Sequence, residues 1–165
     1  RIYEYEKGSF PQVRLHYQWI PCYHCEEPAC ISACAPRALY KEAKYGAVLI
    51  DSQKCDGCRL CYEDCPYGAI VFESDEPGVP AQKCTMCFDR LEQGELPICV
   101  SACPTRALDF GPMSDLVAGY GNNRDLEDLP SSQLTRPAVV FRHHSPKRDL
   151  VPYDAMRALE LLMRS

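Results

Sequence analysis

Hydrophobic and polar positions change pattern every few residues along this chain, so the elements that they predict are short. Residues 13–19 carry an apolar side chain at every second position, which is the period of a β-strand, and they follow a polar segment at 1–12. Residues 38–41 and 47–51 flank a turn at 45–46 and predict a small hairpin. Further strand candidates lie at 69–73 and 137–142. None of these is long enough to be stable alone.

Three helices are predicted from local start and stop signals. Residues 86–93 predict a helix that Gly94 ends. Residues 114–118 predict another, with Ser114 as N-cap and Gly119 as the stop. Residues 152–164 begin with a proline and carry an apolar face. The face consists of Val151, Ala155, Ala158, Leu159 and Leu162. Packing onto the rest of the protein is the ordinary role of such a face.

A short unit recurs three times, at residues 34–39, 65–70 and 103–108. Each copy begins with a cysteine and ends with alanine followed by leucine or isoleucine. Three copies of one pattern indicate an internal repeat.

Composition narrows the class of protein. The 165 residues include 12 Cys and 14 Pro but only 9 Gly, which fits loops wrapped around an inorganic core. A disulfide scaffold, zinc modules and iron–sulfur clusters all use so many thiols. The net charge of -5 argues against nucleic acid as a partner. The apolar runs at 47–50 and 137–141 fall far short of the roughly 20 residues that cross a bilayer, so no membrane span is expected.

The cysteine spacing favours iron–sulfur clusters. Cys55, Cys58, Cys61 and Cys65, followed by Pro66, form the run of bacterial ferredoxins, in which the fourth cysteine ligates the other cluster of a pair. Three thiolates in one tight loop reach three corners of a cubane, and Gly57 supplies a permissive backbone inside that loop. Two looser versions keep the opening Cys-x-x-Cys and the closing Cys-x-x-x-Cys. They are Cys22, Cys25, Cys30, Cys34 and Cys84, Cys87, Cys99, Cys103.

The alternatives fit less well. Disulfide scaffolds belong to small secreted chains, and nothing here marks secretion. Structural zinc uses two ligand pairs separated by a longer span, whereas three thiolates crowd into residues 55–61. His24 either packs or donates a hydrogen bond to cluster sulfur, while His16, His143 and His144 lack ligand-like spacing. No catalytic triad, phosphate loop or dinucleotide motif is found, which favours a carrier over a catalyst.

Over residues 1 to about 115 the chain resembles the iron–sulfur subunits of the molybdopterin oxidoreductases, the kind found in dimethyl sulfoxide reductase. The motifs that carry this resemblance are RIYEY at 1–5, CYHCEEPAC at 22–30, CDGCRLC at 55–61, CPYGA at 65–69, KCTMC at 83–87 and PICVSACP at 97–104. Together they are specific for the family and much less specific for one member. One departure is Ala35, which separates Cys34 from the proline that usually follows the fourth cysteine directly.

The resemblance implies a set of ligands. Family members have four cysteine groups and four clusters. The second group exchanges fourth ligands with the third, and the fourth group pairs with the first. One [4Fe–4S] cluster would use Cys22, Cys25, Cys30 and Cys65, and a second would use Cys55, Cys58, Cys61 and Cys34. Cys84, Cys87 and Cys99 would hold a third, incomplete in this sequence, and Cys103 would belong to a fourth. Since the first group is missing and residue 1 is not methionine, a truncated N-terminus is expected. Because Cys61 is present, the second cluster is expected to have four irons.

The sequence therefore predicts an α+β protein with ferredoxin-like [4Fe–4S] domains, short hairpins and short helices. We expect an N-terminal segment at 1–12, a two-cluster domain at 13–78, half of a second one at 79–111 and a partner-docking extension at 112–165. The expected function is non-catalytic electron relay between a quinol-linked membrane anchor and a molybdopterin catalytic subunit, with membrane association through these partners and the side of the membrane left open. Alternatives are the equivalent subunit of a formate dehydrogenase, polysulfide or tetrathionate reductase or hydrogenase complex, a free polyferredoxin, and a zinc-stabilised interaction module.

Overall fold

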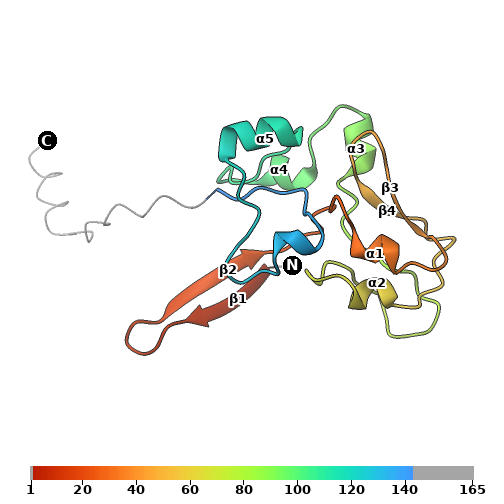
Figure 1. The fold of residues 1–165 in the computed structure, drawn as a ribbon, viewed down its shortest axis with the longest axis horizontal. Helices are drawn as coiled ribbons and strands as arrows, with labels where there is room; N and C mark the ends of the chain where they lie inside the picture. The colour runs from red at the N-terminus through yellow and green to blue at the C-terminus, as the bar shows by residue number, and fades with distance from the viewer. Residues whose placement is uncertain (1, 143–165) are drawn as a thin grey trace, which may run out of the picture.

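A computed structural model describes residues 2–142 of the chain as a small α+β protein of short elements joined by long loops (Figure 1). Two separate antiparallel hairpins supply its strands. The elements in chain order are β1 (Ile2–Lys7), β2 (Arg14–Trp19), α1 (Ala29–Ser32), β3 (Leu39–Lys41), β4 (Val48–Ile50), α2 (Leu60–Glu63), α3 (Phe88–Glu92), α4 (Ile98–Ala102), α5 (Met113–Tyr120) and the 3-10 turn η1 (Ser132–Leu134).

The N-terminal hairpin projects from the body of the protein (Figure 1). Strand β2 confirms the alternation at 13–19, and it pairs with β1 in a register that sets Ile2 opposite Trp19. The sequence pattern missed β1, which lies in the predicted polar segment. Side chains from one face of the hairpin tie it to the body: Tyr5 Oη donates to Asp128 at 2.7 Å, and the Lys7 ammonium lies 2.7 Å from the same carboxylate.

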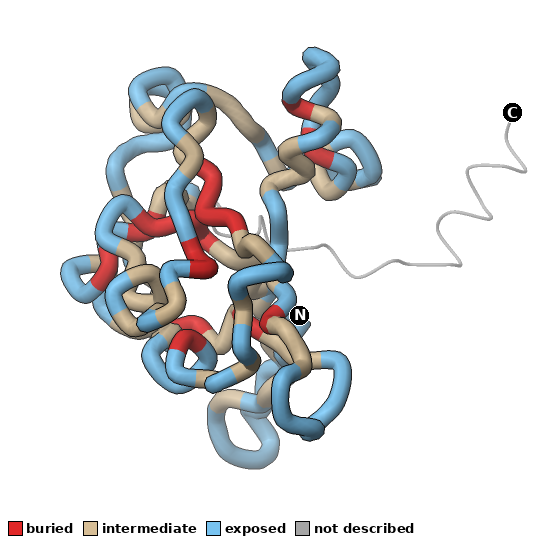
Figure 2. The backbone as a smooth tube through the Cα atoms, turned by 90° about the vertical axis from the view of Figure 1, so that its right-hand side faces the viewer, coloured by how far each residue is buried: buried red, intermediate tan, exposed pale blue. Residues whose placement is uncertain are grey.

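The core lies around the second hairpin. Strands β3 and β4 pair as the sequence predicts, and Gly46 takes a φ of +71° in the connecting turn. Helices α1 and α2 lie side by side next to this hairpin (Figure 1). The buried residues of this cluster are Leu39, Val48, Cys61, Ile70 and Ala81. Buried positions form short internal stretches with exposed and half-buried loops around them (Figure 2).

The internal repeat is visible in the backbone. Helices α1, α2 and α4 each carry a cysteine at their second residue, and a further cysteine follows one or two residues after each helix. After that cysteine the chain makes the same turn three times, in which the fourth residue has a positive φ and donates its N–H to the cysteine carbonyl. These residues are Arg37, Gly68 and Arg106, with N–H to O distances of 3.1, 3.1 and 3.2 Å.

Several predicted elements differ in the structure. Helix α5 is longer than 114–118, because its cap position is Pro112 rather than Ser114 and because the helix continues through Gly119. It stops at Gly121, whose φ of +87° ends the helical backbone. The strand at 69–73 is reduced to one bridge between Val71 and Gln82, and 137–142 forms no strand. The helix predicted at 152–164 lies outside the described residues.

The segment at 123–141 packs back onto the loop at 22–27, which explains why 137–142 pairs with no strand. Its backbone instead makes single hydrogen bonds to separate partners. The Tyr23 carbonyl accepts from Ala138 N–H at 3.0 Å, and the Arg136 carbonyl accepts from Glu26 N–H at 2.8 Å. The first cysteine loop is thus covered by a part of the chain more than 95 residues away.

Candidate metal centre

Each cysteine group opens with a loop that shares one backbone feature. In the three Cys-x-x-Cys loops the residue before the second cysteine has a positive φ: 45° at His24, 73° at Gly57 and 61° at Met86. Only the 55–58 loop requires glycine for space, because a Cβ on Gly57 would lie 2.7 Å from the carbonyl oxygen of Val79. The sequence predicted the freedom of Gly57. It did not predict that a histidine and a methionine take the same conformation, which few non-glycine residues adopt.

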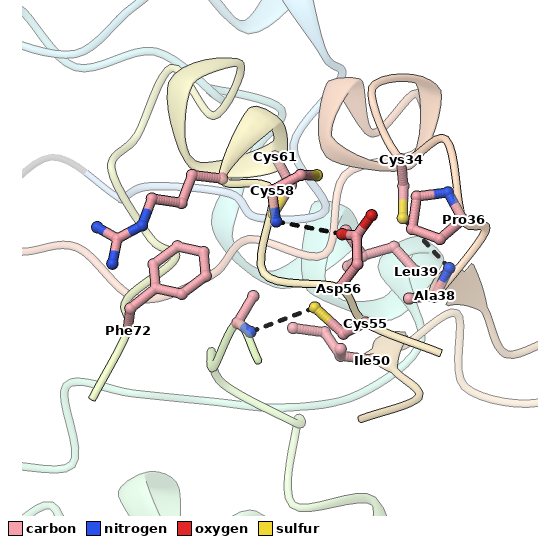
Figure 3. Close-up of a pocket in the computed structure, with 12 residues that line it drawn as sticks. Cys34, Pro36, Ala38, Leu39, Ile50, Cys55, Asp56, Cys58, Cys61 and Phe72 are labelled. Carbon is pink, nitrogen blue, oxygen red and sulfur yellow. Dashed lines mark hydrogen bonds between the residues drawn. The ribbon is translucent and has the colours of Figure 1, made fainter. Parts of the chain in front are cut away.

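One pocket brings together four cysteines from two different groups. Cys34 enters from the turn after α1, and Cys55, Cys58 and Cys61 enter from the loop before α2 and its first turn (Figure 3). The remaining walls include Leu39, Ile50, Phe72 and Ala81. A set of thiols in a mostly apolar pocket is a suitable donor set for an iron–sulfur cluster.

The same four thiols also interact electrostatically, because three of them raise the pKa of the fourth. Burial, followed by negative charge on Cys55, Cys34 and Cys58, raises the pKa of Cys61 to about 11. Such crowded, buried thiols resist ionisation, whereas a metal ligand must be a thiolate. A bound cationic iron centre would remove this conflict.

A second set of thiols interacts in the same way. Burial, followed by the charges of Cys22 and Cys65, raises the pKa of Cys30 to about 12. Burial also raises the pKa of Cys25, to which the charge of Cys65 contributes. Cys65 belongs to the other sequence group, so here too one member of the set comes from elsewhere.

The third group is arranged differently. The charges of Cys84 and Cys87 contribute, after burial, to the raised pKa of Cys99. The pKa of Cys103 is instead lowered by a hydrogen bond with Thr105 and by nearby backbone N–H groups. Burial raises the pKa of Cys22, and the charge of Cys84 contributes to that rise, which fits a third group close to the first.

Backbone N–H groups point at several of the sulfurs. Cys34, Cys65 and Cys103 each accept from the alanine four residues later, at 3.2, 3.4 and 3.3 Å. Cys55 accepts from Ala81 at 3.4 Å, and Cys84 accepts from Met86 at 3.3 Å. Hydrogen bonds of this kind stabilise the charged thiolate, orient it for a metal and influence cluster potentials.

Two buried donors in the first loop lack a partner. Tyr23 Oη and His24 Nε2 are the buried side-chain polar atoms that make no hydrogen bond among the described residues. Both lie between Cys22 and Cys25. Buried donors are normally satisfied, so two orphans in one cysteine loop fit a site that holds an acceptor-rich group such as a sulfide cluster.

The 12 cysteines are all free thiols. Across residues 2–142, no three His, Cys, Asp or Glu side chains form a group that could hold a metal ion. The same part of the chain contains no helix long and apolar enough to cross a membrane.

Comparison with known proteins identifies the family. Residues 13–113 match the family model described as a 4Fe-4S dicluster domain. The chain is 38% identical over 156 residues to the B subunit of anaerobic dimethyl sulfoxide reductase from Escherichia coli, an alignment that covers 90% of this chain and 75% of the relative. It is 40% identical over 172 residues to the beta subunit of selenate reductase from Thauera selenatis, covering 93% and 51%, and 39% identical over 121 residues to the B subunit of sulfite dehydrogenase from Allochromatium vinosum, covering 70% and 50%.

This chain is an iron–sulfur subunit of the molybdopterin oxidoreductase family. The family assignment confirms the sequence-based resemblance, and it makes electron relay through [4Fe–4S] clusters the function of the chain. The relatives are named for different substrates, which are dimethyl sulfoxide, selenate and sulfite.

Residues outside the cysteine motifs also shape the sites of this iron–sulfur subunit. Thr135 is only 2% exposed, and its hydroxyl lies 3.1 Å from the Tyr67 hydroxyl. It also forms a hydrogen bond that lowers the pKa of Cys25 against the larger effect of burial. The Lys41 ammonium donates to the Cys25 carbonyl at 2.7 Å. Sequence spacing gave no signal for these residues, because they approach the cysteines only in the folded chain.

Proposed function

We propose that the chain holds two complete [4Fe–4S] clusters with exchanged fourth ligands. The first would use Cys22, Cys25, Cys30 and Cys65, and the second Cys55, Cys58, Cys61 and Cys34. The pocket shared by the second set carries this proposal, because Cys34 lines it together with three cysteines that lie more than 20 residues away in sequence. The electrostatic link between Cys65 and Cys30 supports the first set.

Two further clusters are proposed for the full-length protein. Cys84, Cys87 and Cys99 would hold one, and Cys103 would ligate the other. After burial, the charges of Cys84 and Cys87 contribute to the raised pKa of Cys99, whereas Thr105 and backbone N–H groups lower the pKa of Cys103, and this difference supports the division of the third group. The completing ligands would come from a cysteine group that this sequence does not contain. A ferredoxin-like two-cluster domain at 13–78 and half of another at 79–111 are the corresponding units.

The proposed role is a non-catalytic relay between a membrane anchor that oxidises or reduces a quinone and a molybdopterin catalytic subunit. The names of the relatives, which are B or beta subunits of reductases and a dehydrogenase, support a partner that carries the catalytic centre. The clusters would accept and pass on single electrons, while the protein sets their potentials through hydrogen bonds, charge and exposure. Membrane association would follow from the anchor.

We propose that the extension at 112–165 docks partner subunits, and that its segment at 123–141 has a second role in covering the first cysteine loop. The described part at 123–141 contacts the first cysteine loop, which supports a covering role there. Arg124 links the two segments, since its guanidinium lies 2.9 Å from the Glu26 carboxylate.

Co-purification tests the relay role. An affinity-tagged chain expressed in its native host under anaerobic conditions is expected to bring down a larger subunit and about one molybdenum per tagged chain. The cofactor resides in the partner, so molybdenum in the eluate reports assembly directly. A brown chain that elutes alone, without molybdenum, would identify a free polyferredoxin instead. A colourless chain containing zinc would identify an interaction module.

A further inference from the structure

His24 occupies an unusual position in the first cysteine loop. It lies between Cys22 and Cys25, it is 4% exposed, and its φ of 45° places it in the left-handed region. The equivalent positions of the other two loops hold Gly57 and Met86, which offer no side-chain donor. The backbone conformation therefore does not require histidine, and the reason for this side chain lies in what its ring contacts.

The hairpin β3–β4 holds the neutral His24 ring in one tautomer. Nδ1 accepts a hydrogen bond from the backbone N–H of Val48 at 2.9 Å. A nitrogen that accepts cannot carry a proton, so in the neutral ring the proton is on Nε2. Nε2–H is buried, and none of the described residues accepts from it. The hairpin thus fixes a donor and aims it away from Val48.

The residue that holds the His24 ring is also linked to the third cysteine group. The Lys83 ammonium donates to the carbonyl of Val48, the residue whose N–H holds the His24 ring, and to the carbonyl of Cys84 at 3.0 Å. Val48 therefore connects the loop of the first group with the start of the third.

We infer that His24 is a positioning donor that gives its Nε2–H to a sulfur of the cluster held by Cys22, Cys25, Cys30 and Cys65, and that it sets the potential of this cluster. The inference rests on the proposed cluster ligands. A hydrogen bond to sulfur stabilises the more negative, reduced form, so it raises the midpoint potential. His24 thereby makes the first cluster easier to reduce than it would be with a methionine at the same position.

His24→Met is the sharpest variant, because methionine already occupies the equivalent position of the third loop with a φ of 61°. It removes the hydrogen-bond donor and keeps a residue type that adopts this left-handed backbone conformation elsewhere in the chain. In the full chain loaded with iron and sulfide, redox titration followed by electron paramagnetic resonance should show one cluster with a lower midpoint. At the wild-type midpoint its ratio of reduced to oxidised cluster should fall about tenfold, which for one electron is about 59 mV.

His24→Gln supplies the rescue, since its amide can donate from a similar distance, and it should keep the midpoint near the wild-type value. His16→Met is the control for replacing a histidine elsewhere, because His16 stacks on Tyr5 in the N-terminal hairpin. The Cys61→Ser variant, which should lose the second cluster, assigns the signals.

The outcomes separate this inference from the proposed function. Unchanged midpoints in a His24→Met chain that retains both clusters would overturn the inference, since the orphan donor would then bind water. A shift confined to the second cluster, or an equal shift in His24→Gln, would overturn it too. Failure of the wild-type chain to form clusters would overturn the proposed function.

Discussion

Replacing Cys34 by serine is expected to damage the cluster of the other cysteine group. In the folded chain Cys34 lines the pocket of Cys55, Cys58 and Cys61, although it lies beyond Cys30 at the end of the first sequence group. A serine oxygen is a poor substitute for thiolate on iron. The variant should therefore lose between one and about four of roughly eight irons, as a three-iron species or as an empty site.

Matched variants make this result diagnostic. Cys61→Ser should abolish the same electron paramagnetic resonance signal as Cys34→Ser, because both residues line one pocket. Cys30→Ser and Cys65→Ser should abolish the other signal. Cys103→Ser is the control, since Cys103 belongs to neither proposed set of ligands, and it should leave both signals intact.

Two results would contradict the exchange of ligands. If Cys34→Ser removed the signal that Cys30→Ser removes, each group would hold its own cluster. Equal loss of both signals in every variant would indicate general unfolding, since cluster binding and folding are coupled.

Truncation after Gly111 is expected to disrupt the first cluster. The deleted segment carries no cysteine, but it covers the 22–27 loop through backbone hydrogen bonds and through the buried hydroxyl of Thr135. Its loss would expose Tyr23, whose ring packs edge-on against Phe141 at 6.0 Å between centroids. The first cluster should be lost or become far more sensitive to oxygen, while the second keeps its signal.

Truncation after Arg142 is the matched control, because it retains every contact described for the covering segment. That shorter deletion should keep both clusters, and iron content with visible absorption during exposure to air would compare the two chains. If both truncated chains hold their clusters as firmly as the full chain, the covering role of 123–141 is wrong. Failure of either truncated chain to bring down molybdenum would then report on docking alone.

The sequence predicted the parts of the fold that depend on local pattern. The alternation at 13–19 gave β2, the paired apolar runs gave β3 and β4, and Gly94 marked the end of α3. The three-fold repeat also proved to be structural, because its three cysteines are followed by the same turn.

Other features depend on contacts between distant residues and left no local signal. Strand β1 was missed because the N-terminal hairpin is largely exposed. An exposed strand needs no strongly apolar face, so its sequence carries no clear strand pattern. In the apolar run at 137–142, Val139 and Phe141 pack partly buried against the Tyr23 cluster rather than in a sheet, and a strand pattern cannot distinguish the two. His24 could be recognised as a candidate donor from its place between two cysteines, but only the bond from Val48 shows which nitrogen carries the proton.

The measurement that tests the central claim most directly is metal and sulfide analysis of the wild-type chain after anaerobic reconstitution, combined with electron paramagnetic resonance of the reduced form. Two complete [4Fe–4S] clusters predict about eight irons and eight sulfides per chain, with a brown colour and two interacting one-electron centres. About twelve irons would mean that the cysteines from Cys84 to Cys103 close a third site by themselves. Stoichiometric zinc without sulfide, in a colourless chain, would contradict electron relay altogether.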